Sequence, residues 1–336
     1  MYAMQKFSAL FIGALLFASC TEERTISDPG NLVPPTVDQD ASLPSIAVNG
    51  IRLHAEAFGH PDSTLVVCLH GGPGGDYRYL LNAKSLADHG YRVVFYDQMG
   101  SGLSQRIHRK QLDDMGIGVL DALYDELKGV IALYRTHQEQ KVILFGHSWG
   151  AILATGFAGR YPNSVQGLIL CEPGGLRWED IEDYIERSRD FSLLGERLND
   201  LAYLDQFITG HRNAHAVLDY KYALATAQNP VTGEDNTKAG SFWRNGAVFS
   251  EALIDMGERE KPDFSQGISQ IAAPVLFFYT ERNKAYPDSW AAHVSGAYPA
   301  AERYKIMGTG HSGPVFETRI WNETTLPKML TFLNAL

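Results

Sequence analysis

The chain has 336 residues, a formal net charge of −10 and 45% hydrophobic residues. This length accommodates one large α/β domain with an inserted subdomain, and the apolar content is ordinary for a globular protein with a large core. The acidic balance, without a Lys/Arg cluster in the sequence, argues against a nucleic-acid partner, which requires a basic face.

The first residues have the pattern of an export signal. Lys6 precedes an apolar run over residues 7–17 that is too short for a comfortable membrane-spanning helix, and small residues follow it. We therefore expect residues 1–19 to be a signal peptide. Ala18-Ser19-Cys20 resembles a bacterial lipobox, so we expect Cys20 to carry lipid and to anchor the exported protein to a membrane of the bacterial cell envelope, facing the periplasm or the surface. An ordinary signal peptide with an incidental cysteine is the alternative.

A polar segment follows Cys20. Residues 20–44 contain four prolines, several acidic residues and few large apolar residues. Such a composition buries too little surface to fold, so we predict a disordered tether between the anchor and the folded part of the chain.

From residue 45 the chain alternates strand-like and helix-like segments. Residues 46–48 and 51–55, joined by Asn49-Gly50, predict an antiparallel hairpin. Further strands are predicted at residues 65–69, 91–96, 141–145, 165–171, 274–279 and 302–307, and helices at residues 85–89, 121–136 and 326–336. This alternation predicts a mostly parallel central sheet with helices on both faces, formed by residues 45–174 and 268–336.

The pattern changes between residues 175 and 267. Strands disappear, and aromatic, charged helical stretches occupy residues 178–189, 198–207 and 214–227. We interpret this segment as a helical cap inserted over the carboxyl ends of the strands, where ligands bind in such sheets. A merely stabilising insertion is the alternative.

Two cysteines besides Cys20 lie in apolar strand-like runs. Cys68 and Cys171 have the setting of small hydrophobic core residues, and they can pair only if their strands bring them together. The sequence has no metal-ligand spacing, so no metal site is expected.

The most informative motif of the chain lies at residues 146–150, Gly146-His147-Ser148-Trp149-Gly150. This Gly-x-Ser-x-Gly segment follows the apolar residues 141–145 and precedes a helical stretch, which is the strand–turn–helix context of a nucleophile elbow. Small residues on both sides allow a sharp turn that projects the Ser148 hydroxyl. We therefore predict Ser148 as the nucleophile of an acyl-transfer site.

A base and an oxyanion hole are expected elsewhere in the chain. His311, in a glycine-rich loop after the last predicted strand, is the candidate base; His293, His211 and His215 lack that setting. One backbone donor is expected from the loop at residues 70–75 (His-Gly-Gly-Pro-Gly-Gly), with Gly72 as the candidate, and the second from Trp149. Because no Lys-Ser/Thr follows that loop, a phosphate-binding P-loop is excluded.

Three segments together resemble the proline iminopeptidase branch of the α/β-hydrolase superfamily. They are residues 70–75, residues 96–104 (Tyr-Asp-Gln-Met-Gly-Ser-Gly-Leu-Ser) and residues 146–150, and the resemblance is weaker in the cap. It implies an α/β-hydrolase fold, hydrolysis of an ester or amide, and no cofactor. It also implies that Asp97 and Gln98 brace the loops around the site. Dehalogenase and epoxide hydrolase activities are disfavoured, because those relatives use Asp where Ser148 stands.

The acid of the triad departs from that family. The resemblance places the usual Asp at Asn283, and an amide cannot offset the charge of an imidazolium. Glu172, at the end of the strand at residues 165–171, is the preferred replacement, because some haloalkane dehalogenases place their acid there. Glu281 is the alternative.

The resemblance also implies a cap carboxylate for the free amine of a peptide substrate. The matching stretch, residues 242–249, has none, and Glu251, Glu179 and Glu182 are the nearest candidates. We therefore predict a serine hydrolase of a small-molecule or short-peptide substrate, acting as an aminopeptidase on N-terminal proline or small residues. A carboxylesterase and a catalytically impaired binding protein are the alternatives.

Overall fold

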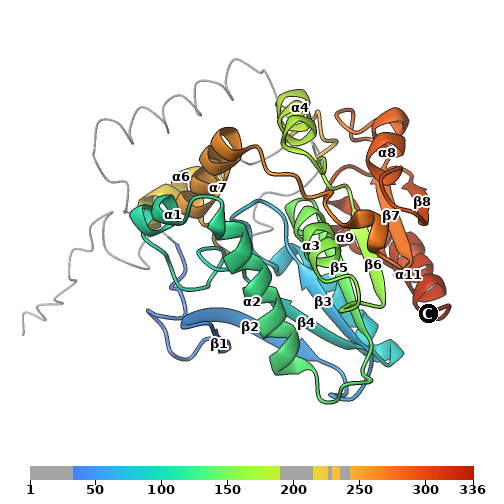
Figure 1. The fold of residues 1–336 in the computed structure, drawn as a ribbon, viewed down its shortest axis with the longest axis horizontal. Helices are drawn as coiled ribbons and strands as arrows, with labels where there is room; N and C mark the ends of the chain where they lie inside the picture. Colours follow the sequence, from blue (N-terminus) through green and yellow to red (C-terminus); the bar gives the residue numbers. More distant parts are fainter. Residues whose placement is uncertain (1–32, 190–214, 226–228, 235–242) are drawn as a thin grey trace, which may run out of the picture.

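The computed structural model describes residues 33–189, 215–225, 229–234 and 243–336. In this part of the chain one sheet has the strand order β1-β2-β4-β3-β5-β6-β7-β8 (Figure 1). Its strands are β1 (Ser45–Val48), β2 (Ile51–Phe58), β3 (Leu65–Leu69), β4 (Arg92–Tyr96), β5 (Val142–His147), β6 (Gly167–Cys171), β7 (Val275–Thr280) and β8 (Ala301–Ile306). Strand β2 is antiparallel to β1 and β4, and the other neighbouring pairs are parallel. The predicted mostly parallel sheet is confirmed.

The predicted hairpin is β1–β2. Asn49 and Gly50 both have positive φ, at 51° and 81°, which is the backbone of the two-residue turn that an Asn-Gly pair favours. Each predicted strand is present within a few residues of its expected ends.

Helices cover both faces of the sheet, and side chains alternate between two hydrophobic cores. In β3, Val67 packs on the face covered by α2 (Gly118–Tyr134) and α3 (Trp149–Arg160), whereas Val66 and Cys68 pack on the opposite face. That opposite face is covered by η1 (Arg78–His89) and α11 (Leu326–Leu333). The remaining short helices of the core are α1 (Arg109–Met115), η2 (Ile268–Gln270), α8 (Asp288–Ser295), α9 (Gly313–Phe316), α10 (Thr318–Ile320) and η3 (Trp321–Thr325).

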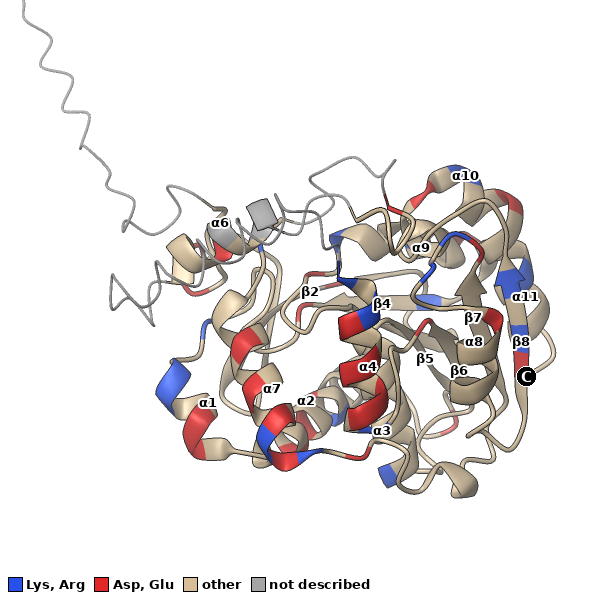
Figure 2. Cartoon of the chain, turned by 90° about the horizontal axis from the view of Figure 1, so that it is seen from above, with Lys and Arg blue, Asp and Glu red and all other residues tan. Residues whose placement is uncertain are grey.

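Three described helices lie between β6 and β7, where the cap was predicted. They are α4 (Trp178–Ser188), α6 (His215–Ala225) and α7 (Ala247–Glu260). The two ends of the insertion are joined, because the Phe264 N–H donates to the Leu176 carbonyl (2.8 Å). The helix expected at residues 198–207 lies outside the described residues, and α7 was not predicted. Asp and Glu residues occur along the helices α1, α4 and α7 (Figure 2).

Part of the predicted tether is folded. Thr36 and Val37 are almost fully buried, and the Val37 N–H donates to the Leu103 carbonyl (2.8 Å). The prediction of disorder is therefore wrong for residues 33–44. Side chains of this segment pack against the folded core, and the composition of the segment by itself does not indicate that packing. The expected signal peptide and Cys20 lie outside the described residues. Within the described residues, no helix is long and apolar enough to span a bilayer.

The two described cysteines, Cys68 and Cys171, are free and buried. They lie on β3 and β6, which β5 separates, so the sheet keeps them apart. Both are core residues, as the sequence indicated.

Candidate active site

The carboxyl ends of the parallel strands bring the predicted site residues to one edge of the sheet. Ser148 directly follows β5 and has φ 54°, a conformation rare outside glycine. Close packing makes this turn possible: a Cβ on Gly150 would lie 2.0 Å from the Leu69 carbonyl oxygen. The Ser148 N–H donates to the Cys171 carbonyl (2.8 Å), which fixes the turn against β6. The segment therefore has the geometry of a nucleophile elbow.

His311 meets Glu172 beside this elbow. The His311 Nδ1 and Glu172 Oε2 atoms are 2.6 Å apart, and the Glu172 side chain is fully buried. The His311 ring also contacts the ring of His147, the residue before Ser148, with centroids 4.5 Å apart. A carboxylate at this distance keeps the proton on Nδ1 and leaves Nε2 as the basic atom of the imidazole.

Glu172 is held by three further donors. The backbone N–H and the hydroxyl of Thr280 donate to Oε1 (2.7 and 2.6 Å), and Asn283 Nδ2 donates to Oε2 (2.8 Å). Asn283 thus supports the carboxylate from the place where the family's acid was expected. Glu281, the alternative acid, instead accepts the Gly308 N–H (2.9 Å). Of the two predicted carboxylates, the structure brings only Glu172 to His311.

The pKa of His311 reflects this neighbourhood. Burial lowers its pKa, but the hydrogen bond and the charge of Glu172, with a smaller effect of Glu234, outweigh burial and leave it raised above 6.5. The imidazole is therefore a stronger base than an isolated histidine, and Glu172 also stabilises the imidazolium that forms when it takes a proton.

The predicted oxyanion loop follows β3. Gly72 has φ 127°, and a Cβ there would lie 2.6 Å from the backbone nitrogens of Gly74 and Gly75, so only glycine fits. The Gly71 N–H already donates to Tyr79 Oη (2.7 Å) and the Gly75 N–H to the Gly71 carbonyl (3.2 Å), so Gly72 stays the candidate donor that the sequence favoured. Trp149 opens α3, where the first N–H groups lack acceptors within the helix.

The loop after β4 joins the oxyanion loop to the elbow. Gln98 donates through its side chain to the His70 carbonyl (3.1 Å) and accepts the indole N–H of Trp149 (2.9 Å). Asp97 accepts the N–H groups of Tyr77 and Leu103 (2.9 and 2.8 Å). These bonds fit the bracing role that the resemblance implied for both residues.

The other candidate residues lie in different settings. His293 is exposed and contacts Asp180 (3.1 Å), and His215 packs near His108, while His211 lies outside the described residues. Among the cap carboxylates, Glu251 pairs with Arg109 (3.3 Å) and Glu182 with Lys261 (3.5 Å). Glu179 is exposed on α4.

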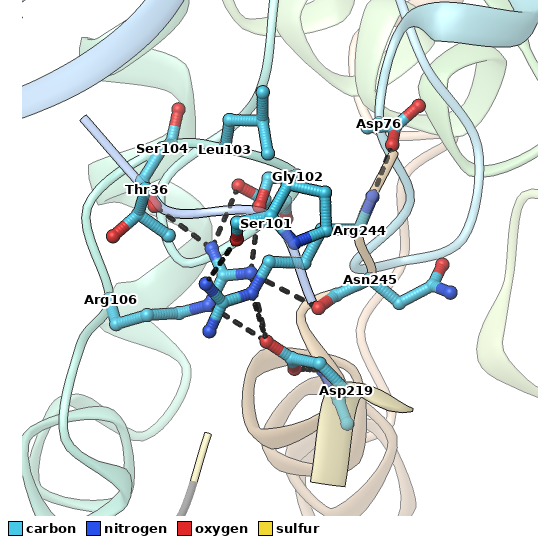
Figure 3. Close-up of polar contacts among 12 residues, drawn as sticks. Thr36, Asp76, Ser101, Gly102, Leu103, Ser104, Arg106, Asp219, Arg244 and Asn245 are labelled. Carbon is cyan, nitrogen blue, oxygen red and sulfur yellow. Dashed lines mark hydrogen bonds and ion pairs between the residues drawn. The ribbon is translucent and has the colours of Figure 1, made fainter. Parts of the chain in front are cut away.

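A buried cluster of charged side chains holds the cap to the core of the protein (Figure 3). Asp219 of α6 contacts Arg106 Nη2 (3.0 Å) and Arg244 Nε (2.7 Å) through one carboxylate oxygen, and its other oxygen accepts the N–H of Ala247, the first residue of α7 (2.9 Å). The neighbouring Gly246 N–H donates to the Gly74 carbonyl (2.6 Å). The cluster thus ties two cap helices to the oxyanion loop.

Comparison with known proteins identifies the family to which this fold belongs. The family model of the α/β hydrolase fold matches residues 64–318. The chain is an α/β hydrolase.

Relatives place this α/β hydrolase in the proline iminopeptidase-like branch. Proline iminopeptidase of Arabidopsis thaliana is 31% identical over 295 residues, which cover 77% of this chain and 72% of the relative. Proline iminopeptidase of Thermoplasma volcanium is 36% identical over 133 residues, 39% of this chain, and the chain spans only 41% of that relative's length. The crystal structure of proline iminopeptidase from Mycobacterium smegmatis has a TM-score of 0.56 at 20% identity, covering 87% of this chain and 99% of that one.

Several residues of this α/β hydrolase's site were not predicted. Glu234 accepts the N–H of Ser312, and Thr232 accepts the N–H of His311 (2.9 Å), so a short cap turn holds the histidine loop. Tyr79 and His147 contact each other (2.8 Å). His147 lies within the recognised motif, which was a usable signal. Tyr79 and Glu234 carry no sequence signal of their own, because long-range packing alone brings them to the site.

Proposed function

We propose that this protein is a serine hydrolase that cleaves a small ester or amide through an acyl-enzyme. The observation that supports it best is the 2.6 Å contact between His311 Nδ1 and Glu172 Oε2 beside the strained turn of Ser148. A nucleophile, a base and an orienting carboxylate at one edge of a sheet are the components of acyl transfer.

Each residue has a distinct part in the proposed reaction. His311 Nε2 takes the Ser148 proton as the hydroxyl oxygen attacks the substrate carbonyl. The N–H groups of Gly72 and Trp149 hold the oxyanion of the tetrahedral intermediate. The protonated His311 gives its proton to the leaving group. His311 then takes a proton from water as the water oxygen attacks the acyl carbonyl, and it returns that proton to the Ser148 oxygen as the acid product leaves.

Labelling with a fluorophosphonate probe tests this proposal. The wild-type protein is expected to label at the serine, and Ser148→Ala is expected to lose labelling. Ser164→Ala is the matched control, because Ser164 caps a turn after α3 through its bond to the Tyr161 carbonyl (2.6 Å). Equal labelling of the wild type and Ser148→Ala, or no labelling of any of the three, overturns the proposal.

For the substrate, we favour an aminopeptidase of N-terminal proline or small residues. The iminopeptidase relatives support this, and Glu234 is a cap carboxylate beside the His311 loop that can attract an ammonium group. A carboxylesterase is the second candidate, since residues 243–249 carry no carboxylate. Aminoacyl-naphthylamides compared with p-nitrophenyl esters separate them: Glu234→Gln should raise KM for the amides alone if the peptidase assignment is correct.

A hydrolase-fold binding protein without turnover is the alternative from another class. Asn283 at the family's acid position favoured it, but the bond from Asn283 to Glu172 weakens that argument. Tight binding of peptides together with absent probe labelling would support it.

We also propose export and lipid anchoring at Cys20, from residues 1–44 of the sequence. Mass spectrometry of the mature N-terminus from membranes is the test, and an unmodified Cys20 would contradict the anchor.

A further inference from the structure

A buried chain of hydrogen bonds connects the oxyanion loop to the histidine loop. The Gly71 N–H donates to Tyr79 Oη (2.7 Å), Tyr79 Oη contacts His147 Nδ1 (2.8 Å), and His147 Nε2 contacts the His311 carbonyl oxygen (2.9 Å). Tyr79 belongs to η1 and His147 is the last residue of β5, and their side chains are buried. The chain of hydrogen bonds therefore includes His147, the residue that directly precedes Ser148.

Elementary donor and acceptor rules fix the direction of every bond. A carbonyl oxygen only accepts, so His147 Nε2 must carry the proton and donate to His311. The neutral ring then has a bare Nδ1, which accepts the Tyr79 hydroxyl proton, and the Tyr79 oxygen accepts the Gly71 N–H. Burial first, and then the neighbouring His311, hold the pKa of His147 well below its ordinary value, which keeps this single neutral tautomer.

The sheet alone does not align the two loops that this chain joins. The oxyanion loop follows β3 and the His311 loop follows β8, and the strand order places β5, β6 and β7 between them. Small changes in twist along four strand pairs would add up to a displacement between the loops. A side-chain link across the sheet edge removes that freedom.

We propose that Tyr79 and His147 are positioning residues that hold the oxyanion loop and the His311 loop in register around Ser148. Gly71 supports this, because a Cβ there would lie 3.0 Å from both Ser148 Cβ and Tyr79 Oη, so this peptide packs directly on the nucleophile. The next peptide is Gly72, the candidate oxyanion donor. This inference rests on the proposed serine hydrolase function and concerns residues that do not touch the substrate.

Tyr79→Phe removes the central hydroxyl while keeping the ring. We expect the rate of fluorophosphonate labelling and kcat to fall roughly tenfold to hundredfold with KM little changed, because misplaced donors weaken the transition state more than substrate binding. Tyr298→Phe is the matched control: its buried hydroxyl bonds Thr155 (2.7 Å) away from the site, and its kcat should stay within about twofold of wild type.

A double-mutant cycle with His147→Phe tests whether the two residues act as one chain. If they do, the double variant should be little slower than the more impaired single variant, whereas independent effects would multiply. Wild-type kcat in Tyr79→Phe, or multiplying effects in the cycle, overturns the inference.

A spectroscopic measurement on the wild type keeps the inference testable if the variants do not fold. Nitrogen-15 NMR of histidine-labelled protein should find His147 neutral with its proton on Nε2, and a proton on Nδ1 contradicts the chain. If the wild type does not label with the probe, the proposed function is wrong. The NMR measurement of the His147 tautomer does not depend on labelling, so it tests the chain of hydrogen bonds separately.

Discussion

Two residues at the site hold unusual backbone conformations. Ser148 and Glu172 have φ values of 54° and 45°, although neither is glycine, and they follow the neighbouring strands β5 and β6. Such conformations each cost on the order of 1–3 kcal/mol and persist only where the surroundings impose them. In Glu172 the cost is offset by four partners on the carboxylate, which aims it at His311.

Glu172→Gln isolates the charge of that carboxylate, since glutamine has nearly the same shape. Turnover should fall by about 10³–10⁴-fold, because the amide neither stabilises the imidazolium nor holds the tautomer. Besides Glu172, the groups that face the His311 loop are Glu234, His147 and the hydroxyl of Tyr184, which lies 3.4 Å from His311 Nδ1. Glu281→Gln is the control, and we expect its kcat/KM to remain within about threefold of wild type. The opposite ranking would assign the acid to Glu281.

The same pair of variants predicts a shift in pH dependence. His311 must be neutral to act as a base, so kcat/KM of the wild type should decline as pH falls through its raised pKa, above 6.5. Without the charge of Glu172 the protonated form is less favoured, and burial then dominates. The acidic limb of residual Glu172→Gln activity should therefore move to lower pH in a pH–rate profile, and an unmoved limb would argue against the assignment.

At the scale of elements, α2 supports the loop after β4 through a buried carboxyl group. Glu126 accepts the Met99 N–H (3.0 Å), and burial raises the pKa of Glu126 to about 8, although the Met99 bond partly lowers it. Met99 follows Gln98, which joins the oxyanion loop to Trp149. The protonation of Glu126 in α2 is thus coupled to the packing of the loop after β4, which braces the site.

The stability of the protein should fall with rising pH because of Glu126. Between pH 4.5 and about 8 the unfolded chain releases this proton while the folded chain keeps it, which lowers the free energy of unfolding by up to about 1.4 kcal/mol per pH unit. Glu126→Gln removes this contribution, so its stability relative to wild type should increase from pH 5 to pH 8. Urea unfolding at both pH values measures it, with exposed Glu139→Gln as control; parallel pH slopes in all three proteins would refute the prediction.

At the scale of the whole molecule, the cap is held to the core by charge as well as by apolar contact. Asp219 is fully buried and serves two guanidinium groups, and Arg244 also donates to the Pro34 carbonyl (2.8 Å) in the N-terminal segment. One carboxylate therefore joins α6, α7, the loop after β4 and the segment at residues 33–44.

Asp219→Asn should destabilise the protein by about 3–5 kcal/mol, because it leaves two buried guanidinium groups without their counter-charge. Asp121→Asn is the matched control: it removes the partner of Arg160 in an exposed pair and should cost no more than about 1 kcal/mol. Thermal or urea unfolding compares them. Equal effects of the two substitutions would mean that the Asp219 cluster contributes no more than a surface ion pair.

The sequence by itself predicted the mostly parallel sheet, its covering by helices on both faces and the elbow at Ser148. Short apolar runs, the Asn49-Gly50 turn and the Gly-x-Ser-x-Gly segment are local signals, which can be recognised without knowledge of distant contacts. Their order along the chain was enough to place Ser148 and His311 at the same edge of a parallel sheet.

Only the tertiary structure decided which carboxylate faces His311, how residues 33–44 pack, and which side chains link the loops. Glu172 and Glu281 were both acceptable in sequence, and hydrogen bonds from Thr280 and Asn283 separate them. Tyr79 meets His147 across 68 residues of chain. Contacts between such distant segments depend on how whole elements pack, and no periodicity or composition of the separate segments encodes that packing.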